Sequence, residues 1–207
     1  MAKDILISDE RLSFSQVLAT VLKEAGYTVL LTSEDNDNKA LRWNRNTPFA
    51  LQHLDIQLKT RNMENANSVL VFDAIEYAKI FSSDSLIAID KTCSELITAY
   101  ATLVFILKSL MIKQESGRLI FVLRNDENAA AENFAVNMAA KAFAELAENT
   151  AQRLSTKRLP KVQSLLVKLE VPDKNSAAWL LSQLELPVLS RNNAKWVKAG
   201  ARGFFSK

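Results

Sequence analysis

The sequence DILIS at residues 4–8 is a short apolar run typical of a buried strand, and TVLLT at residues 28–32 repeats the pattern. Between them, apolar side chains recur at helical spacing and predict one buried helix face: Phe14, Val17, Leu18, Val21, Leu22 and Ala25. Gly26 follows the last of these positions, where a helix end favours a residue that tolerates positive φ. The order strand, helix, strand predicts two parallel strands joined by a right-handed crossover.

The rest of the chain continues this alternation. Residues 33–48 are polar and Asn-rich, which is typical of a loop or short helix. Further strands are expected at 49–56, 68–72, 118–123, 162–169 and 194–198, and helices at 92–113, 129–154 and 177–184. Mostly uncharged strands bounded by helices predict a parallel sheet covered on both faces. We therefore expect an α/β, Rossmann-like doubly wound fold with a mainly parallel sheet of six or seven strands, in a single domain over residues 1–207.

Charge is distributed unevenly along the chain. Residues 151–207 contain 11 Lys and Arg against 3 Asp and Glu, while residues 1–150 contain 15 against 20. A basic C-terminal quarter is compatible with an acidic partner or nucleic acid, and also with a basic face on a globular domain. Basic and aromatic residues are mixed over 195–205, which suits either stacking on nucleic acid or a last strand whose aromatic tail packs on a neighbouring subunit.

The cysteine, histidine and hydropathy patterns exclude several classes of protein. The single Cys93 forbids an intrachain disulfide and fits a reducing compartment. His53 is the only histidine, so a histidine-based metal cluster or catalytic triad is not expected. The start of the chain has no apolar signal-peptide core, and the longest uncharged apolar stretch, residues 96–107, is too short to span a bilayer. We expect a cytoplasmic protein without a membrane segment.

Two long helices indicate an oligomer. The predicted helix 92–113 is apolar nearly all round its middle, so a single sheet face does not account for its composition. The predicted helix 129–154 is rich in alanine, which allows close approach of another helix. Together they predict a second buried surface, and hence a homodimer or higher oligomer through these helices. An unusually apolar packing within one chain is the alternative.

At this point the chain resembles the short-chain dehydrogenase/reductase family, over nearly its whole length. The family's first strand leads into T-G-x-x-x-G-x-G and then a helix that ends in Gly, and residues 8–15 occupy that motif here without a gap. Ser8 stands for the threonine, whereas Asp9, Ser13 and Ser15 replace the three glycines. The family's N-N-A-G corresponds to residues 72–75, where only Ala74 is kept.

The resemblance also places the family's catalytic residues. The catalytic serine, tyrosine and asparagine correspond to Arg124, Asn137 and Leu96, and only the lysine is kept, as Lys141. Arg124 and Lys141 are candidates for an anion pocket at the carboxyl edge of the sheet, or for ordinary solvated or salt-bridged cations. Asp55, followed by an isoleucine, resembles the family's adenine-contacting Asp and is a possible remnant of NAD or NADP binding.

These replacements disfavour both the binding of a dinucleotide and the family's acid–base catalysis. Carboxylates at Asp9 and Glu10 would stand where phosphate oxygens belong, and two like charges about 4 Å apart repel by roughly 4 kcal/mol at an effective dielectric of 20. We interpret Asp9 instead as an N-cap of the following helix. Asn137 has no acid–base chemistry near neutral pH.

Three functional hypotheses follow. The leading one is a catalytically inactive short-chain-dehydrogenase-like protein that needs no cofactor and acts as an oligomeric binding or regulatory module. The second is a divergent NAD(P)-dependent oxidoreductase. The third is binding of nucleic acid or an acidic partner through the basic C-terminal quarter.

Overall fold

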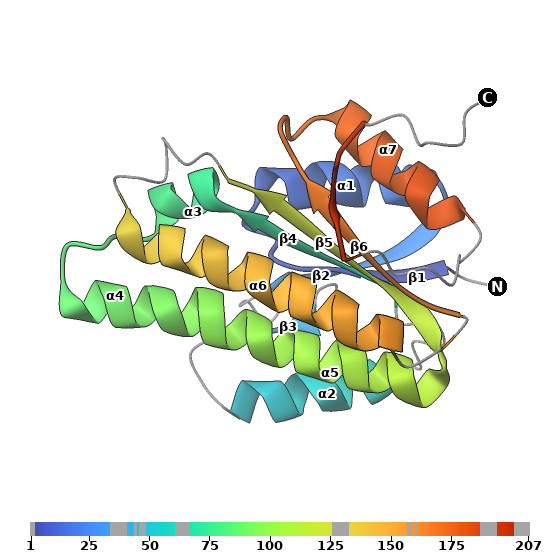
Figure 1. Ribbon diagram of the computed structural model, residues 1–207, viewed down its shortest axis with the longest axis horizontal. Coiled ribbons are helices and arrows are strands. Elements are labelled where there is room, and N and C mark those ends of the chain that lie inside the picture. The colour runs from blue at the N-terminus through green and yellow to red at the C-terminus, as the bar shows by residue number, and fades with distance from the viewer. Residues whose placement is uncertain are drawn as a thin grey trace.

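The computed structural model describes residues 3–33, 41–43, 45, 49–60, 67–125, 133–156, 159, 161–186 and 194–200. Within them, seven strands form one parallel sheet in the order β3-β2-β1-β4-β5-β6-β7 (Figure 1). The predicted α/β doubly wound fold is therefore confirmed. The strands are β1 (Lys3–Ile7), β2 (Tyr27–Ser33), β3 (Leu41–Arg42), β4 (Asn67–Asp73), β5 (Ser116–Arg124), β6 (Lys161–Lys168) and β7 (Trp196–Lys198).

Helices cover both faces of the sheet. The helices α1 and α7 contact each other on one face, while α5 and α6 lie side by side on the other, with α2 beside α5 (Figure 1). The helical elements are α1 (Ser13–Glu24), α2 (Phe49–Thr60), α3 (Ala74–Ile80), α4 (Leu86–Cys93), η1 (Ser94–Thr98), α5 (Ala99–Gln114), α6 (Phe134–Thr156) and α7 (Lys174–Glu185).

The first strand–helix–strand unit forms as its sequence predicts. Ile5 in β1 pairs with Val29 in β2, in parallel register. The buried side of α1 includes Phe14, Leu18 and Leu22, which are spaced three to four residues apart. Gly26 has φ +83° just after the helix end, which confirms the predicted left-handed residue.

The third strand is not where we predicted it. Residues 49–56 belong to the helix α2, and β3 is a two-residue strand, Leu41–Arg42, inside the segment expected to be a loop or short helix. Leu54 and Leu58 are buried at a spacing of four, and Asp55 pairs with Lys59 at the same spacing. A short apolar run fits a strand or a buried helix by pattern alone, and here the four-residue spacing prevails.

The helix predicted at 92–113 is longer than expected. It runs continuously from Leu86 through the π-helical turn η1 to Gln114. This helix is long and apolar enough to cross a membrane, and half of its most apolar stretch is buried inside the fold. The other long helix, predicted at 129–154, spans Phe134–Thr156, and residues 129–132 lie outside the described part of the chain.

The strand order reverses between β1 and β4. From β1 the chain moves outward to β2 and β3, and then returns to β4 on the other side of β1. In open α/β sheets, ligands bind at such a reversal, outside the carboxyl ends of the strands. The carboxyl ends of β1 and β4 therefore mark the place to look for a site.

Candidate functional site

A buried carboxylate stands at the carboxyl end of β1. Asp9 has φ +56°, so it keeps the left-handed conformation that glycine adopts easily at this position of the motif. Its backbone N–H donates to Thr32 Oγ1 at 2.8 Å. Only 1% of Asp9 is exposed. The first strand–helix turn thus places a negative charge inside the protein.

Two arginines neutralise this charge. The Arg11 guanidinium contacts both Asp9 oxygens, with Nε 3.0 Å from Oδ1 and Nη2 3.1 Å from Oδ2. Arg45 Nη2 lies 2.8 Å from Asp9 Oδ2, and both of those side chains are 2% exposed. Burial raises the pKa of Asp9, but the two arginines and the Tyr77 hydroxyl outweigh it and lower that pKa to about 2.

Aromatic side chains surround Arg45 and the Asp9 carboxylate. The Arg45 guanidinium lies 4.2 Å from the centre of the Trp43 ring, a cation–π distance. Tyr77 donates to Asp9 Oδ2 at 2.5 Å, and its oxygen lies 2.7 Å from the Tyr100 hydroxyl. Tyr100 in turn donates to the Val71 carbonyl of β4. Burial raises the pKa of both phenols, so they act as neutral hydrogen-bond donors.

The helix that begins beside this cluster already carries an anion. Glu76, in α3, accepts the Ser13 backbone N–H at 2.8 Å and also the Ser13 hydroxyl. The N-terminus of a helix attracts negative charge because its first N–H groups lack helical partners. The predicted N-cap role of Asp9 is wrong. The residue before α1 is Leu12, and the Asp9 carboxylate accepts the Arg11 backbone N–H at the turn before it.

The structure also shows where the other motif residues lie. Ser8 and Ser15 are buried and linked, because the Ser15 hydroxyl donates to the Ser8 carbonyl at 2.9 Å. Ala74 is the buried first residue of α3, directly after Asp73. Glu10 contacts the hydroxyl of Ser33 at the end of β2.

The positions equivalent to the family's catalytic residues come from three elements: Arg124 from β5, Leu96 from η1, and Asn137 and Lys141 from α6. Arg124 ends β5 and pairs with Asp73 at 3.1 Å. Lys141 is exposed on α6. It lines a pocket at the carboxyl ends of β5, β6 and β7, and Arg124 is not among the residues that line this pocket. Asn137 is half-buried, and Leu96 is a core residue of η1 with 1% exposure. Of the two alternatives left open for Arg124, the salt-bridged cation is the one that the structure shows, since the Asp73 carboxylate pairs with its guanidinium.

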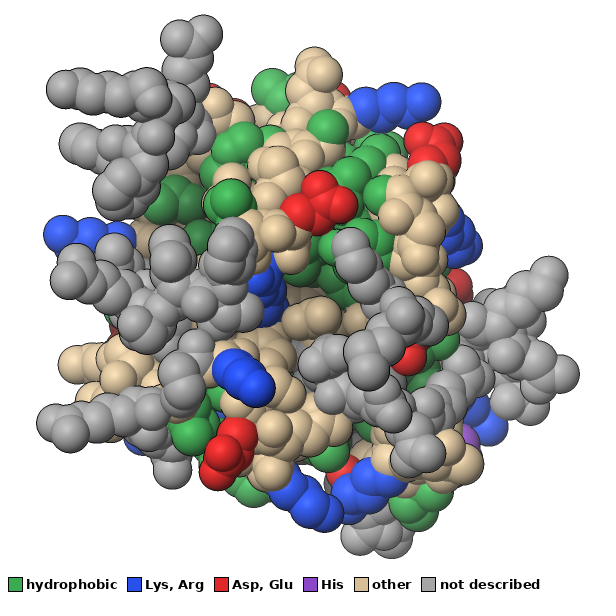
Figure 2. Space-filling model, turned by 90° about the vertical axis from the view of Figure 1, so that its right-hand side faces the viewer, with side chains coloured by type: hydrophobic (Ala, Val, Ile, Leu, Met, Phe, Trp, Pro, Cys, Tyr) green, Lys and Arg blue, Asp and Glu red, His purple; other side chains and the backbone are tan. Residues whose placement is uncertain are grey.

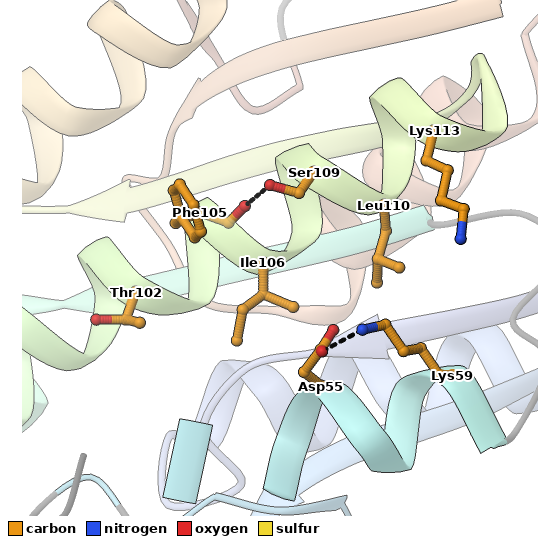
Figure 3. A pocket seen from close by; sticks show the side chains of 8 residues that line it. All are labelled: Asp55, Lys59, Thr102, Phe105, Ile106, Ser109, Leu110 and Lys113. Carbon is orange, nitrogen blue, oxygen red and sulfur yellow. Dashed lines mark hydrogen bonds and ion pairs between the residues drawn. The ribbon is translucent and has the colours of Figure 1, made fainter. Parts of the chain in front are cut away.

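Asp55 lies on the outer helix layer. It is on α2, where it pairs with Lys59 and faces Ile106 and Leu110, which line the α5 side of a groove between the two helices (Figure 3). His53 is exposed on the same helix and contacts the Gln57 side chain. Asp55 lies within a helix and not at the end of a strand. It therefore does not occupy the position of the family's adenine-contacting Asp.

Several residues of the cluster had no signal in the sequence. Glu76 and Tyr77 come from α3, Tyr100 from α5, and Arg45 from a segment expected to be a loop. Glu76 reaches α1, and Tyr77 and Arg45 reach Asp9, across long sequence separations, while Tyr100 contacts the Tyr77 hydroxyl. Only Asp9 itself was singled out, because it replaces a glycine of the motif.

Comparison with known proteins places the chain in a family. No protein-family model matches it. A protein of Treponema pallidum (strain Nichols), described only as uncharacterized, is 34% identical over 215 residues that cover 100% of this chain and 97% of the relative. The chain belongs to the family of this treponemal protein.

Solved structures of short-chain dehydrogenases share the fold. An NADPH-dependent reductase involved in bacilysin biosynthesis, YwfH, superposes with a TM-score of 0.71 at 13% identity, over 96% of this chain and 98% of that one. A short-chain dehydrogenase from Streptomyces avermitilis gives 0.69 at 12% identity, over 97% and 88%. One from Leptospira borgpetersenii with bound NAD⁺ gives 0.68 at 7% identity, over 96% and 91%. At these identities the similarity establishes the short-chain-dehydrogenase-like fold alone.

Proposed function

We propose that this protein is a catalytically inactive member of the short-chain-dehydrogenase-like fold, which acts as an oligomeric binding or regulatory module. The observation that carries the proposal is the Glu76 carboxylate on the backbone N–H of Ser13, at the N-terminus of α1. In dinucleotide-binding folds the cofactor's pyrophosphate takes this place. Here a side chain of the protein itself supplies the anion.

The residues around that helix end do not fit a dinucleotide. A pyrophosphate would have to displace Glu76 and approach the buried Asp9 carboxylate. Two unit charges about 4 Å apart repel by roughly 4 kcal/mol at an effective dielectric of 20, which is about three decades of affinity. Arg45, the cation nearest to Asp9, is buried against Trp43 and is already paired. These contacts support weak or absent binding of NAD and NADP.

The catalytic positions support the same proposal. The family's mechanism needs a phenol that exchanges a proton, and Asn137 has none to exchange. The two phenols of the cluster, Tyr77 and Tyr100, are fully buried behind Asp9 and Val71. A substrate carbonyl has no route to either hydroxyl in this arrangement.

A cofactor titration tests the proposal. We expect neither NADH nor NADPH at sub-millimolar concentration to raise the melting temperature or to produce heat in calorimetry, because a ligand that binds only the native state must stabilise it. An active short-chain dehydrogenase serves as the positive control. A shift of several degrees would favour the second hypothesis, a divergent NAD(P)-dependent oxidoreductase, whose support is the fold shared with an NADPH-dependent reductase.

An exposed apolar surface supports the oligomeric part of the proposal. On the outer side of α5 and α6, Phe105 is 62% exposed, Phe134 50% and Met138 46%. Large apolar side chains exposed on two neighbouring helices are compatible with an interaction surface. We propose that a second copy of the chain covers it.

Binding of nucleic acid has less support. Trp196 is half-buried in β7, and its indole Nε1 donates to Glu148 at 2.6 Å, so its ring is engaged within the fold. On the face at the amino ends of the strands, basic side chains are interspersed with acidic and apolar ones (Figure 2). Residues 201–207 of the basic tail lie outside the described part of the chain.

A further inference from the structure

A pocket of about 450 Å³ lies at the carboxyl ends of β5, β6 and β7, under α6. Its volume is within the range of small-molecule sites, and the carboxyl edge of a parallel sheet is where such folds bind ligands. The cluster around Asp9 belongs to the other half of this edge, at β1 and β4. None of the residues of the Asp9 cluster lines this pocket.

Small residues on α6 create the space. Ala140 and Ala144, four residues apart on one side of the helix, form part of the wall. Trp196 of β7 also lines the pocket. The hydrogen bond from the Trp196 indole to Glu148 fixes the ring's orientation, so the pocket has an apolar wall held in place.

The charges around the pocket leave two cations unpaired. Lys198 pairs with Glu170 at 2.6 Å, and Glu148 accepts the indole N–H. Lys141 and Lys168 also line the pocket, and neither has a carboxylate partner within the described part of the chain. Glu148 keeps its charge when it accepts the neutral indole N–H, so the lining has three lysines against two carboxylates and one net positive charge. A negatively charged ligand group is therefore favoured beside Lys141 and Lys168.

One buried oxygen of the pocket lining lacks a hydrogen-bond donor among the described residues. The side-chain oxygen of Asn125, at the end of β5, is buried and has no hydrogen-bond partner among the described residues. A buried acceptor without a partner loses the hydrogen bond it would have in water. A hydroxyl or amino group on a bound ligand would supply it.

We propose that this pocket binds a small aromatic carboxylate that carries a hydroxyl or amino donor. The carboxylate lies between Lys141 and Lys168, the ring packs on Trp196 and the two alanines, and the donor reaches Asn125. This inference rests on the proposed function in treating the protein as a binding module, and it names the class of ligand. It does not require that the cofactor site be lost.

Calorimetric titration of the full-length protein with 4-hydroxybenzoate tests the proposal. We expect binding of 4-hydroxybenzoate, weaker binding of benzoate, which lacks the donor, and weaker binding of 4-hydroxybenzamide, which lacks the charge. Equal affinity for the charged compound and the neutral amide would overturn the role of the lysines. Binding of inorganic phosphate as tight as that of 4-hydroxybenzoate would overturn the aromatic carboxylate.

Matched variants locate the binding. Lys141→Gln and Lys168→Gln are each expected to weaken 4-hydroxybenzoate binding about fivefold, the effect of one partly exposed ion pair. Ala144→Leu fills the pocket with a good helix former and should abolish binding. Lys23→Gln, at the exposed end of α1 on the other face, should leave it unchanged. Circular dichroism confirms that each variant is folded, and binding that survives Ala144→Leu would refute the pocket.

The two proposals fail separately. If NADPH binds and 4-hydroxybenzoate also binds in a Lys168-dependent way, the pocket stands and the inactive-module proposal falls. If neither compound binds, the cofactor proposal stands and the pocket falls.

Discussion

The carboxylate of Glu76 accepts the backbone N–H of Ser13 at 2.8 Å, so α3 supplies the anion at the first turn of α1. The two residues are 63 positions apart, and their contact joins the structure after β4 to the structure after β1. The interaction is both a helix cap and a charge–dipole pairing. It occupies the helix end that dinucleotide-binding proteins leave for phosphate.

Removing the Glu76 side chain should destabilise the protein. Glu76→Ala leaves Ser13 without its partner, and we expect the free energy of unfolding to fall by about 0.5–2 kcal/mol, as for loss of an N-cap. Glu76→Gln keeps an acceptor oxygen and should cost less than Glu76→Ala. Urea denaturation of both variants checks the order. A Glu76→Ala protein as stable as the wild type would argue that this contact is absent in solution.

Neutralising Asp9 should cost much more. Asp9→Asn leaves the buried Arg45 guanidinium without its counter-charge, and breaking one side of a buried pair typically costs about 3–5 kcal/mol. Asp55→Asn is the matched control, because it breaks the exposed pair with Lys59 and should cost no more than about 0.5 kcal/mol. Similar losses in the two variants would contradict the buried network.

Because the pKa of Asp9 is lowered, we expect the free energy of unfolding to fall at acidic pH. The pKa of Asp9 is about 2 in the folded protein, against an ordinary value of 3.8. A group with a lowered folded-state pKa stabilises the protein above its unfolded-state pKa, and that stability is lost as the pH falls through its folded-state pKa. We expect about 2 kcal/mol to be lost between pH 4 and pH 2, by analogy with shifts of this size. Asp9→Asn should lack this step in urea titrations across that range.

The fold was predictable because its signals are local. The spacing of Phe14, Leu18 and Leu22 and the glycine at position 26 are enough to define the first β-α-β unit. The prediction of the third strand was wrong because this strand has only two residues, Leu41 and Arg42. A pairing that short depends on neighbouring chain rather than on its own pattern.

The site was only partly predictable, because its partners are distant in sequence. A missing glycine at Asp9 indicates an altered phosphate loop, but nothing near it indicates that Arg45 and Tyr77 meet its carboxylate. The family register placed Lys141 on α6 correctly, yet it carried no information on its surroundings. Those depend on Lys168 and Trp196, which come from strands later in the chain.

Restoring a single catalytic residue should not restore catalysis. Asn137→Tyr supplies a phenol, but Arg124 stays paired with Asp73, and Glu76 still occupies the start of α1. Groups that act as a unit do not contribute additively, so one of them gains little alone. We expect no NADPH oxidation above background with simple ketones, in either wild type or variant. Wild-type turnover that disappears in Lys141→Ala would overturn the inactive-module proposal.

Phe105 provides the test of self-association. It lies on the outer side of α5 with 62% of its surface exposed. A two-fold contact is self-complementary, so each apolar residue at its centre is buried in both copies. Burying a phenylalanine contributes about 1.5–3 kcal/mol. A charge placed there is therefore introduced twice, and we expect Phe105→Glu to dissociate the dimer or to make the protein insoluble.

Light scattering coupled to size exclusion measures the outcome at micromolar concentration. Lys23→Glu, on α1 across the sheet, is the control for a charge change that leaves the α5–α6 surface intact, and it should stay dimeric. A monomeric wild type would refute the interface. In that case the exposed Phe105, Phe134 and Met138 would either meet a different partner or stay in water as single side chains, which is normal on a protein surface.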